Sequence, residues 1–220
     1  MFDFFLILCF GSLGLMIFVL GILIGFSIKN SYRSRLLLNQ NRGEAAVRKV
    51  ITSNFKSPNF HLLNNVTIPF QDGTTQIDHV LISTKGVFVI EVKNYSGWIF
   101  GNEKSKQWMQ SIYRVKSQFQ NPIHQNFRHV IAMQQLLEFL PKEQIHSIVV
   151  FSGSAEFKSP IPKGVFYLRQ LSNHLNTFQE DVISLNRLEF CVGRLECKRY
   201  DLTRATDIQH RAYLMKKFGD

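Results

Sequence analysis

The sequence has little cysteine and few acidic residues. Only three of its 220 residues are cysteine, and Cys191 and Cys197, the two outside the apolar N-terminus, lack disulfide-framework spacing. This argues against a disulfide-stabilised secreted domain and places the soluble part in a reducing, cytosol-like compartment. Aspartate and glutamate number 16 against 26 lysines and arginines, a formal net charge of +10. Such a chain attracts polyanions, and charge alone does not distinguish nucleic acid from an anionic membrane face.

Charged residues are absent from residues 4–28, a run of 25 residues. A helix of that length is roughly 37 Å long and crosses a hydrocarbon core of about 30 Å with some tilt. The alternative is a cleavable signal peptide, but no basic residue precedes the run and no small-residue cleavage pattern stands out before Lys29. We therefore predict a transmembrane anchor over residues 1–28, followed by a basic linker over residues 29–42.

Basic residues follow the predicted anchor closely, at Lys29, Arg33, Arg35 and Arg42. The positive-inside bias then predicts a single-pass membrane protein with its C-terminal domain in the cytoplasm. Within the span, the glycines of the segment 21–25 are four residues apart, a spacing that lets two helices pack closely and permits a homodimer.

Residues 43–220 are enough for one ordinary domain. Hydrophobic periodicity and turn residues predict a helix over 43–55, strands over 61–70, 76–83 and 87–95, a hairpin formed by 97–101 and 107–113, a helix over 121–140, strands over 145–151 and 164–168, and helices from 172 onward. Strands interleaved with helices predict a layered α/β or α+β domain. No internal repeat or low-complexity stretch interrupts it.

Charged residues interrupt the two most apolar strands. Glu91 and Lys93 lie two residues apart on the strand 87–95 and therefore project from the same face, after an apolar start that predicts burial on both sides. If residue numbers in opposed pairs of the hairpin sum to 171, Asp78 lies across from Lys93 and diagonal to Glu91. A three-residue loop would instead place Asp78 opposite Val92, so the prediction depends on the length of the turn between the two strands.

Two acids and one lysine at the end of an apolar sheet leave a surplus negative charge if they form a mere buried ion pair. A divalent cation balances that charge, and carboxylate oxygens with waters suit Mg²⁺ or Mn²⁺. Such a metal lowers the pKa of a bound water and stabilises charge on a phosphate. Lys93 would hold the attacking water or stabilise the phosphate's developing charge.

A third acid, Glu44, lies on the apolar stripe of the first predicted helix, three residues before Val47. An inward-facing carboxylate needs a reason, because burying it unpaired is unfavourable. Both a functional role and a favourable position in the first turn of the helix account for it on pattern alone.

These residues resemble a known family. Asp78 followed by Glu91-Val92-Lys93 is similar to the D…(D/E)xK signature of the restriction-endonuclease-like PD-(D/E)xK superfamily. The blocks Gly43-Glu44, 72–79 and 86–97, and then Asn121-Pro122 with Gln125, resemble the nuclease-related domain, NERD, most strongly over 43–140. One departure is Ile77, where the superfamily often has a proline.

The resemblance implies a layered α/β/α core with a mixed central sheet, and site roles for six residues. Asp78 and Glu91 would bind the metal, with the Val92 carbonyl completing the site, and Lys93 would be the catalytic lysine. Glu44 would match the helix-borne acid of the superfamily, and Gln125 a polar position that contacts substrate or water.

The function these features predict is a membrane-anchored, Mg²⁺- or Mn²⁺-dependent nuclease that hydrolyses phosphodiester bonds, of DNA rather than RNA. Basic residues outside the motif fit a nucleic-acid binder collectively: Arg114, Lys116, Arg128, Arg204, Arg211, Lys216 and Lys217. One alternative is a membrane-tethered, non-catalytic nucleic-acid-binding module on the same fold. Another is a protein whose basic surface binds anionic lipid.

Overall fold

The structure is a computed structural model that describes residues 42–55 and 58–218. The predicted anchor (1–28), its glycine-spaced segment with the dimer it would permit, and all of the linker but Arg42 lie outside the described residues. None of the described helices has both the length and the apolar character needed to cross a bilayer. Contacts group residues 42–220 into one compact unit.

Five strands form the central sheet in the order β1-β2-β3-β7-β9. They are β1 (Phe60–Phe70), β2 (Gly73–Ser83), β3 (Gly86–Lys93), β7 (Ile145–Phe151) and β9 (Val165–Tyr167). β1, β2 and β3 pair antiparallel, whereas β3, β7 and β9 pair parallel, so the sheet is mixed. β3 is buried on both faces, as its continuous Val, Ile and Phe content predicts.

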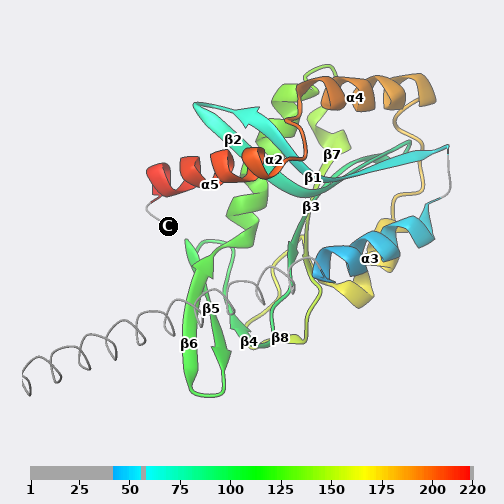
Figure 1. The fold of residues 1–220 in the computed structure, drawn as a ribbon. Helices are drawn as coiled ribbons and strands as arrows, with labels where there is room; N and C mark the ends of the chain where they lie inside the picture. The colour runs from blue at the N-terminus through cyan, green and yellow to red at the C-terminus, as the bar shows by residue number, and fades with distance from the viewer. Residues whose placement is uncertain (1–41, 56–57, 219–220) are drawn as a thin grey trace, which may run out of the picture. The chain divides into compact units, whose positions relative to one another are not determined.

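Helices cover both faces of this sheet (Figure 1). On one face, α2 (Pro122–Leu136) and α4 (Leu185–Lys198) pack on the side of β3 that carries Val87 and Val89. On the other, the first helix (residues 42–54) and α3 (Leu168–Leu175) pack on the side that carries Phe88 and Ile90. This confirms the predicted mixed α/β layering. A further helix, α5 (Arg204–Phe218), contacts β2.

A second sheet, in the order β6-β5-β4-β8, lies at one end of the first. Its strands are β4 (Gly97–Phe100), β5 (Gln107–Ile112), β6 (Val115–Gln120) and β8 (Ala155–Phe157). The predicted hairpin corresponds to β4 and β5, while β6 and β8 were not predicted. Trp108 is buried and stacks on Phe151, whereas Trp98 is 51% exposed.

The register of the β2–β3 hairpin differs from the prediction by two residues. Ser83 pairs with Gly86 and His79 with Ile90, so opposed numbers sum to 169 rather than 171. The turn is Thr84-Lys85, and Gly86 belongs to the strand, where its φ of +135° and the close approach of the His146 ring favour glycine. Asp78 therefore aligns with Glu91, one step beyond the last ladder pair, rather than with Lys93.

The start of α2 is held by Asn121, which is fully buried. Its Oδ1 accepts a hydrogen bond from the Ile123 N–H at 2.9 Å, and its Nδ2 donates to the carbonyls of Ser105 at 2.7 Å and of Asn102 and Glu103 at 3.2 Å. Pro122 at the first helical position completes the predicted helix start. One side chain thus joins α2 to the loop between β4 and β5.

We expect Asn121→Ala to lower the free energy of unfolding by about 2–4 kcal/mol, because it removes a helix cap together with the three hydrogen bonds that the buried Asn121 amide donates to the loop between β4 and β5. Chemical denaturation measures this. The control is Ser184→Ala at the exposed start of α4, where Ser184 Oγ caps the Arg187 N–H at 3.4 Å. There we expect a loss of about 1 kcal/mol. Equal losses at both caps would contradict a special role for Asn121.

Candidate active site

Three carboxylates and a lysine gather where β2, β3 and the first helix meet. Glu91 on β3 is 2% exposed and Asp78 on β2 is 9% exposed. Lys93 Nζ lies 2.7 Å from Glu91 Oε1. Asp78 Oδ2 accepts a hydrogen bond from the Val92 backbone N–H at 2.7 Å, where the β2–β3 ladder ends. The carboxylate thus takes the place of a ladder partner, which fixes it beside Glu91.

Glu44 reaches this group because the first helix starts very close to the sheet. A Cβ on Gly43 would lie 2.5 Å from Ser152 Oγ and 2.8 Å from Asn94 Cβ, so only glycine fits. Asn94 follows β3 and Ser152 follows β7, so this close approach sets the first turn of the helix against the ends of two strands. Glu44, the next residue, is 9% exposed and close enough to Glu91 for mutual repulsion.

Helix α2 supplies two further side chains to the cluster. Gln125 Oε1 accepts a hydrogen bond from Lys93 Nζ at 3.0 Å. His129, four residues on and therefore on the same face of the helix, places Nε2 3.2 Å from Glu91 Oε2 and Nδ1 2.7 Å from Thr75 Oγ1. Both Glu91 oxygens are therefore engaged, one by Lys93 and the other by His129.

The rotation of α2 that presents these two residues is fixed by Asn126, which lies between them in sequence and is fully buried. Its Nδ2 lies 3.0 Å from the Val89 carbonyl, 3.1 Å from the Ile148 carbonyl and 2.8 Å from Ser147 Oγ. These bonds tie the helix to β3 and β7, the central parallel pair. Gln125 and His129 are thereby held over the carboxyl end of β3.

The electrostatics of the cluster favour positive charge. Burial, and then repulsion from Glu91, raise the pKa of Asp78 well above its usual value, although Lys93 and the Val92 N–H act in the opposite direction. Burial, and then Glu91, also raise the pKa of Glu44. The negatively charged forms of Asp78 and Glu44 are therefore unfavourable so close to Glu91. A cation bound between these carboxylates would offset the repulsion and favour their charged forms.

Glu91 itself behaves differently. Burial raises its pKa, but the charge of Lys93 and the contacts with His129 more than offset this, and its pKa is lowered. Burial lowers the pKa of Lys93, and attraction to Glu91 outweighs that effect, so the pKa of Lys93 is raised. Glu91 and Lys93 are therefore an ionised pair, with Asp78 and Glu44 as the surplus acids beside it.

A family model, the nuclease-related domain, matches residues 39–152. The chain belongs to the NERD family. A protein of Bacillus anthracis, itself uncharacterised, is 48% identical over 188 residues, which are 80% of this chain and 84% of that protein. No solved structure matches the chain. The resemblance drawn from the sequence is confirmed, and every predicted site residue lies inside the matched region.

NERD is a nuclease domain of PD-(D/E)xK type, a class that typically uses divalent metals. Among the described residues, no group of three or more histidine, cysteine, aspartate or glutamate side chains forms a ready-made metal cage. Magnesium is usually bound by one or two carboxylates and several waters, so two acids suffice. The surplus charge of Asp78 and Glu44 beside Glu91 fits such a hard cation.

The structure brings Glu44, Asp78, Glu91, Lys93 and Gln125 together. Val92 contributes its N–H to Asp78, while its side chain packs in the core on the opposite face. His129 and Thr75 were not predicted as members of the cluster. The signal for His129 was its spacing of four residues from Gln125, which places both on one helix face. The roles of these residues in metal binding and catalysis stay predictions.

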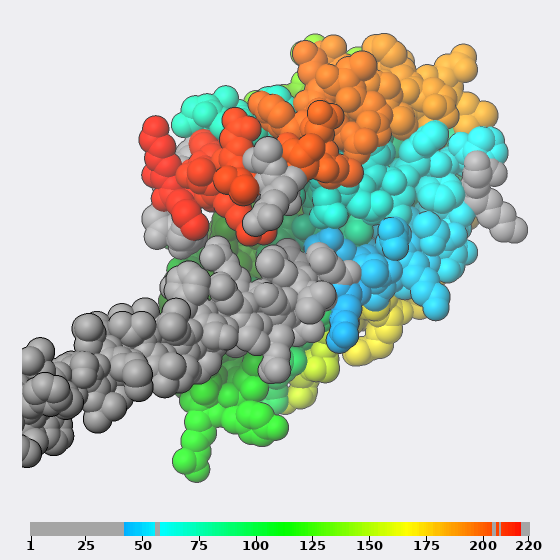
Figure 2. Space-filling model, viewed as in Figure 1, coloured from blue at the N-terminus to red at the C-terminus, as the bar shows by residue number. Residues whose placement is uncertain are grey.

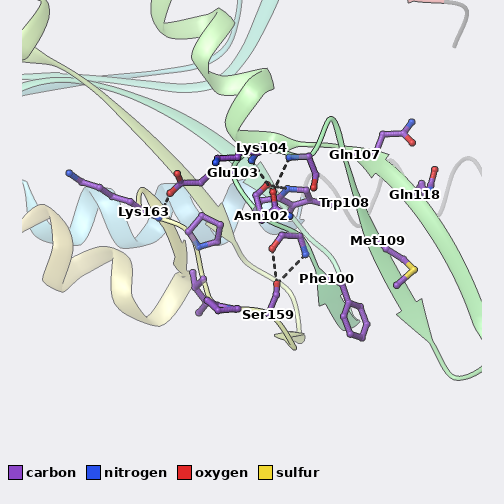
Figure 3. Close-up of a pocket in the computed structure, with 15 residues that line it drawn as sticks. Phe100, Asn102, Glu103, Lys104, Gln107, Trp108, Met109, Gln118, Ser159 and Lys163 are labelled. Carbon is purple, nitrogen blue, oxygen red and sulfur yellow. Dashed lines mark hydrogen bonds between the residues drawn. The ribbon is translucent and has the colours of Figure 1, made fainter.

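A separate pocket lies at the second sheet (Figure 3). It has a volume of about 1100 Å³ and runs between the loop 101–105 and the segment 159–163. Ser159 Oγ donates to the Gly101 carbonyl at 2.7 Å and accepts from its N–H at 3.1 Å, which holds the two walls together. Its charged lining consists of Glu103, Lys104 and Lys163, with no cluster of acids. The chemistry of the family points to the buried carboxylates rather than to this pocket.

Proposed function

We propose that this chain is a divalent-metal-dependent nuclease that hydrolyses phosphodiester bonds of nucleic acid, DNA in preference to RNA. The observation that carries the proposal is the meeting of Asp78, Glu91 and Lys93 at one end of β3, inside the region that matches the NERD family. The nuclease-related family supports nucleic acid as the partner, and the net charge of +10 is in keeping with a polyanionic substrate.

Asp78 and Glu91 would hold Mg²⁺ or Mn²⁺, with Glu44 acting through water and the Val92 carbonyl completing the site. The bound metal would lower the pKa of a water molecule and stabilise negative charge on the phosphate. Lys93, held between Glu91 Oε1 and Gln125 Oε1, would orient the attacking water and stabilise charge on the phosphate. His129 would keep the second Glu91 oxygen in place.

A place at the membrane is a separate part of the proposal. It rests on the uncharged run 4–28 and on the basic residues that follow it, which predict a single-pass anchor with the nuclease domain in the cytoplasm. Such an anchor would confine cleavage to nucleic acid that reaches the membrane surface.

The test is cleavage by the full chain, kept in mild detergent, with labelled duplex DNA, single-stranded DNA and RNA in Mg²⁺, Mn²⁺ or excess chelator. We expect cleavage that requires the divalent ion, with DNA as the better substrate. Glu91→Gln is expected to lower the rate at least about a hundredfold, because it removes a metal ligand and the partner of Lys93. Cleavage that persists in chelator, or in Glu91→Gln at the wild-type rate, would reject the assignment.

A second candidate is a membrane-tethered, non-catalytic nucleic-acid-binding module. The engagement of both Glu91 oxygens by Lys93 and His129 favours it, because a side chain so occupied has less capacity for a metal. Carboxylate oxygens each accept more than one partner, however, so a metal ligand role is compatible with both contacts. Salt-sensitive binding without cleavage in any divalent ion would identify this second function.

A further inference from the structure

A small cavity of about 120 Å³ adjoins the carboxylate cluster. The side chains that line it include Thr74, Thr75, Gln125, Arg128, His129 and His210. Three of them also belong to the active site: Gln125 binds Lys93, His129 binds Glu91, and Thr75 binds His129. The cavity and the cluster thus share a wall, so a group in the cavity would lie next to the reacting phosphate.

The chemistry of the cavity is opposite to that of the cluster. Among the described residues that line it there is no aspartate or glutamate. Arg128 supplies a permanent positive charge, and the glutamine amides, Thr74 and His210 carry hydrogen-bond donors, whereas both ring nitrogens of His129 are engaged by Glu91 and Thr75. Glu91 lies behind His129 and Lys93, which engage both its oxygens. A lining of this kind suits an anion rather than a cation.

Helix α5 closes the outer side of the cavity. His210 Nδ1 lies 2.7 Å from Thr74 Oγ1, and Tyr213 Oη donates to Asp72 Oδ1 at 3.0 Å. The Tyr213 ring packs against Gly73 so closely that a Cβ there would lie 2.1 Å from the ring. In Figure 2, α5 (red) lies on the surface of the molecule. α5 follows the region matched by the family, residues 39–152.

We propose that this cavity binds a phosphate group of the nucleic-acid strand, distinct from the phosphate that is cleaved. The proposal rests on the nuclease function proposed above and deepens it. An arginine guanidinium binds phosphate oxygens through paired hydrogen bonds, and threonine hydroxyls and glutamine amides are common phosphate donors. The cavity has room for one such group. If a phosphate binds there, α5 takes part in substrate binding through His210.

The phosphate has two sources, the end of a strand or its interior. Both are tested by equilibrium binding of the full chain to a labelled oligonucleotide, with a 5′-phosphate or a 5′-hydroxyl, in excess chelator so that no cleavage occurs. We expect Arg128→Gln to weaken binding of at least one of these strands about tenfold, as the loss of a charge-assisted hydrogen bond predicts. The control is Arg169→Gln on α3, where the exposed guanidinium stacks on Tyr167 away from the cavity.

A loss confined to the 5′-phosphorylated strand would identify a terminal phosphate, and an equal loss for both strands an internal one. A loss no greater than that of Arg169→Gln would overturn the proposal. A second pair of variants on α5 tests the same point without removing charge. Leu214→Trp fills the cavity and is expected to weaken binding, whereas Met215→Trp, at a residue 54% exposed, is expected to leave it unchanged.

Failure of the cavity and failure of the nuclease proposal give different results. If the wild type binds with the expected dependence on Arg128 but cleaves nothing in Mg²⁺ or Mn²⁺, the phosphate site is supported and the nuclease function is rejected. If the wild type cleaves with a divalent ion while Arg128→Gln and Leu214→Trp bind the oligonucleotides as well as their controls do, the nuclease function is supported and the phosphate site is rejected.

Discussion

Lys93→Met is expected to lower nuclease activity by about a thousandfold and to lower the free energy of unfolding by about 3 kcal/mol. The activity falls because Lys93 is the one cation placed beside both Glu91 and Gln125 within the described cluster. The stability falls because Glu91, 2% exposed, loses the cation that offsets its burial, so that the carboxylate is either charged without its principal partner or takes up a proton. Rates are measured under single-turnover conditions, and stability by chemical denaturation.

A second lysine provides the control. Lys158, which follows β8, pairs with Glu156 on that strand at 2.5 Å, but these side chains are 34% and 62% exposed. A surface pair contributes at most about 1 kcal/mol, so Lys158→Met is expected to change stability little and cleavage not at all. The double variant Glu91→Gln/Lys93→Met is expected to be more stable than Lys93→Met alone, because it removes the unpaired charge. Equal stability losses in the two lysine variants would contradict a buried ion pair at β3.

The sequence predicted the central strands well because their signal is local. The run 145–151 is continuously apolar but for His146 and Ser147, and it forms β7 within the predicted bounds. Glu91 and Lys93 share a face through the two-residue period of a strand, whatever packs around them. Asp78 stayed on that face despite the wrong register, because the error was an even number of residues.

The features that the sequence did not predict depend on tertiary contacts. β6 has mostly exposed residues and little apolar pattern, and its pairing with β5 decides its structure. Gly86 resembles a turn residue, yet the approach of His146 from the neighbouring strand requires glycine inside β3. His129 joins the site only because Asn126 fixes the rotation of α2 on the sheet. That contact is long-range and has no local signature.

Mg²⁺ added to chelator-treated protein is expected to raise the melting temperature, and Asp78→Asn is expected to abolish this response together with cleavage. A ligand at a hundred times its dissociation constant stabilises a fold by about 2.7 kcal/mol. Burial and repulsion from Glu91 raise the pKa of Asp78, so its charged form destabilises the metal-free fold. Asparagine keeps an acceptor for the Val92 N–H but carries no charge. The variant is therefore expected to be at least as stable as the wild type in chelator.

The combination of results separates a metal ligand from a structural acid. A carboxylate needed only for packing would give a variant less stable than the wild type in chelator, with an intact response to Mg²⁺. The control is Asp181→Asn, because Asp181 lies on the surface in a 3.0 Å pair with Lys85 and is expected to keep both the metal response and cleavage. If Asp78→Asn is still stabilised by Mg²⁺ to the wild-type extent, the metal is bound elsewhere. The carboxylates at the end of β3 would then not be its site.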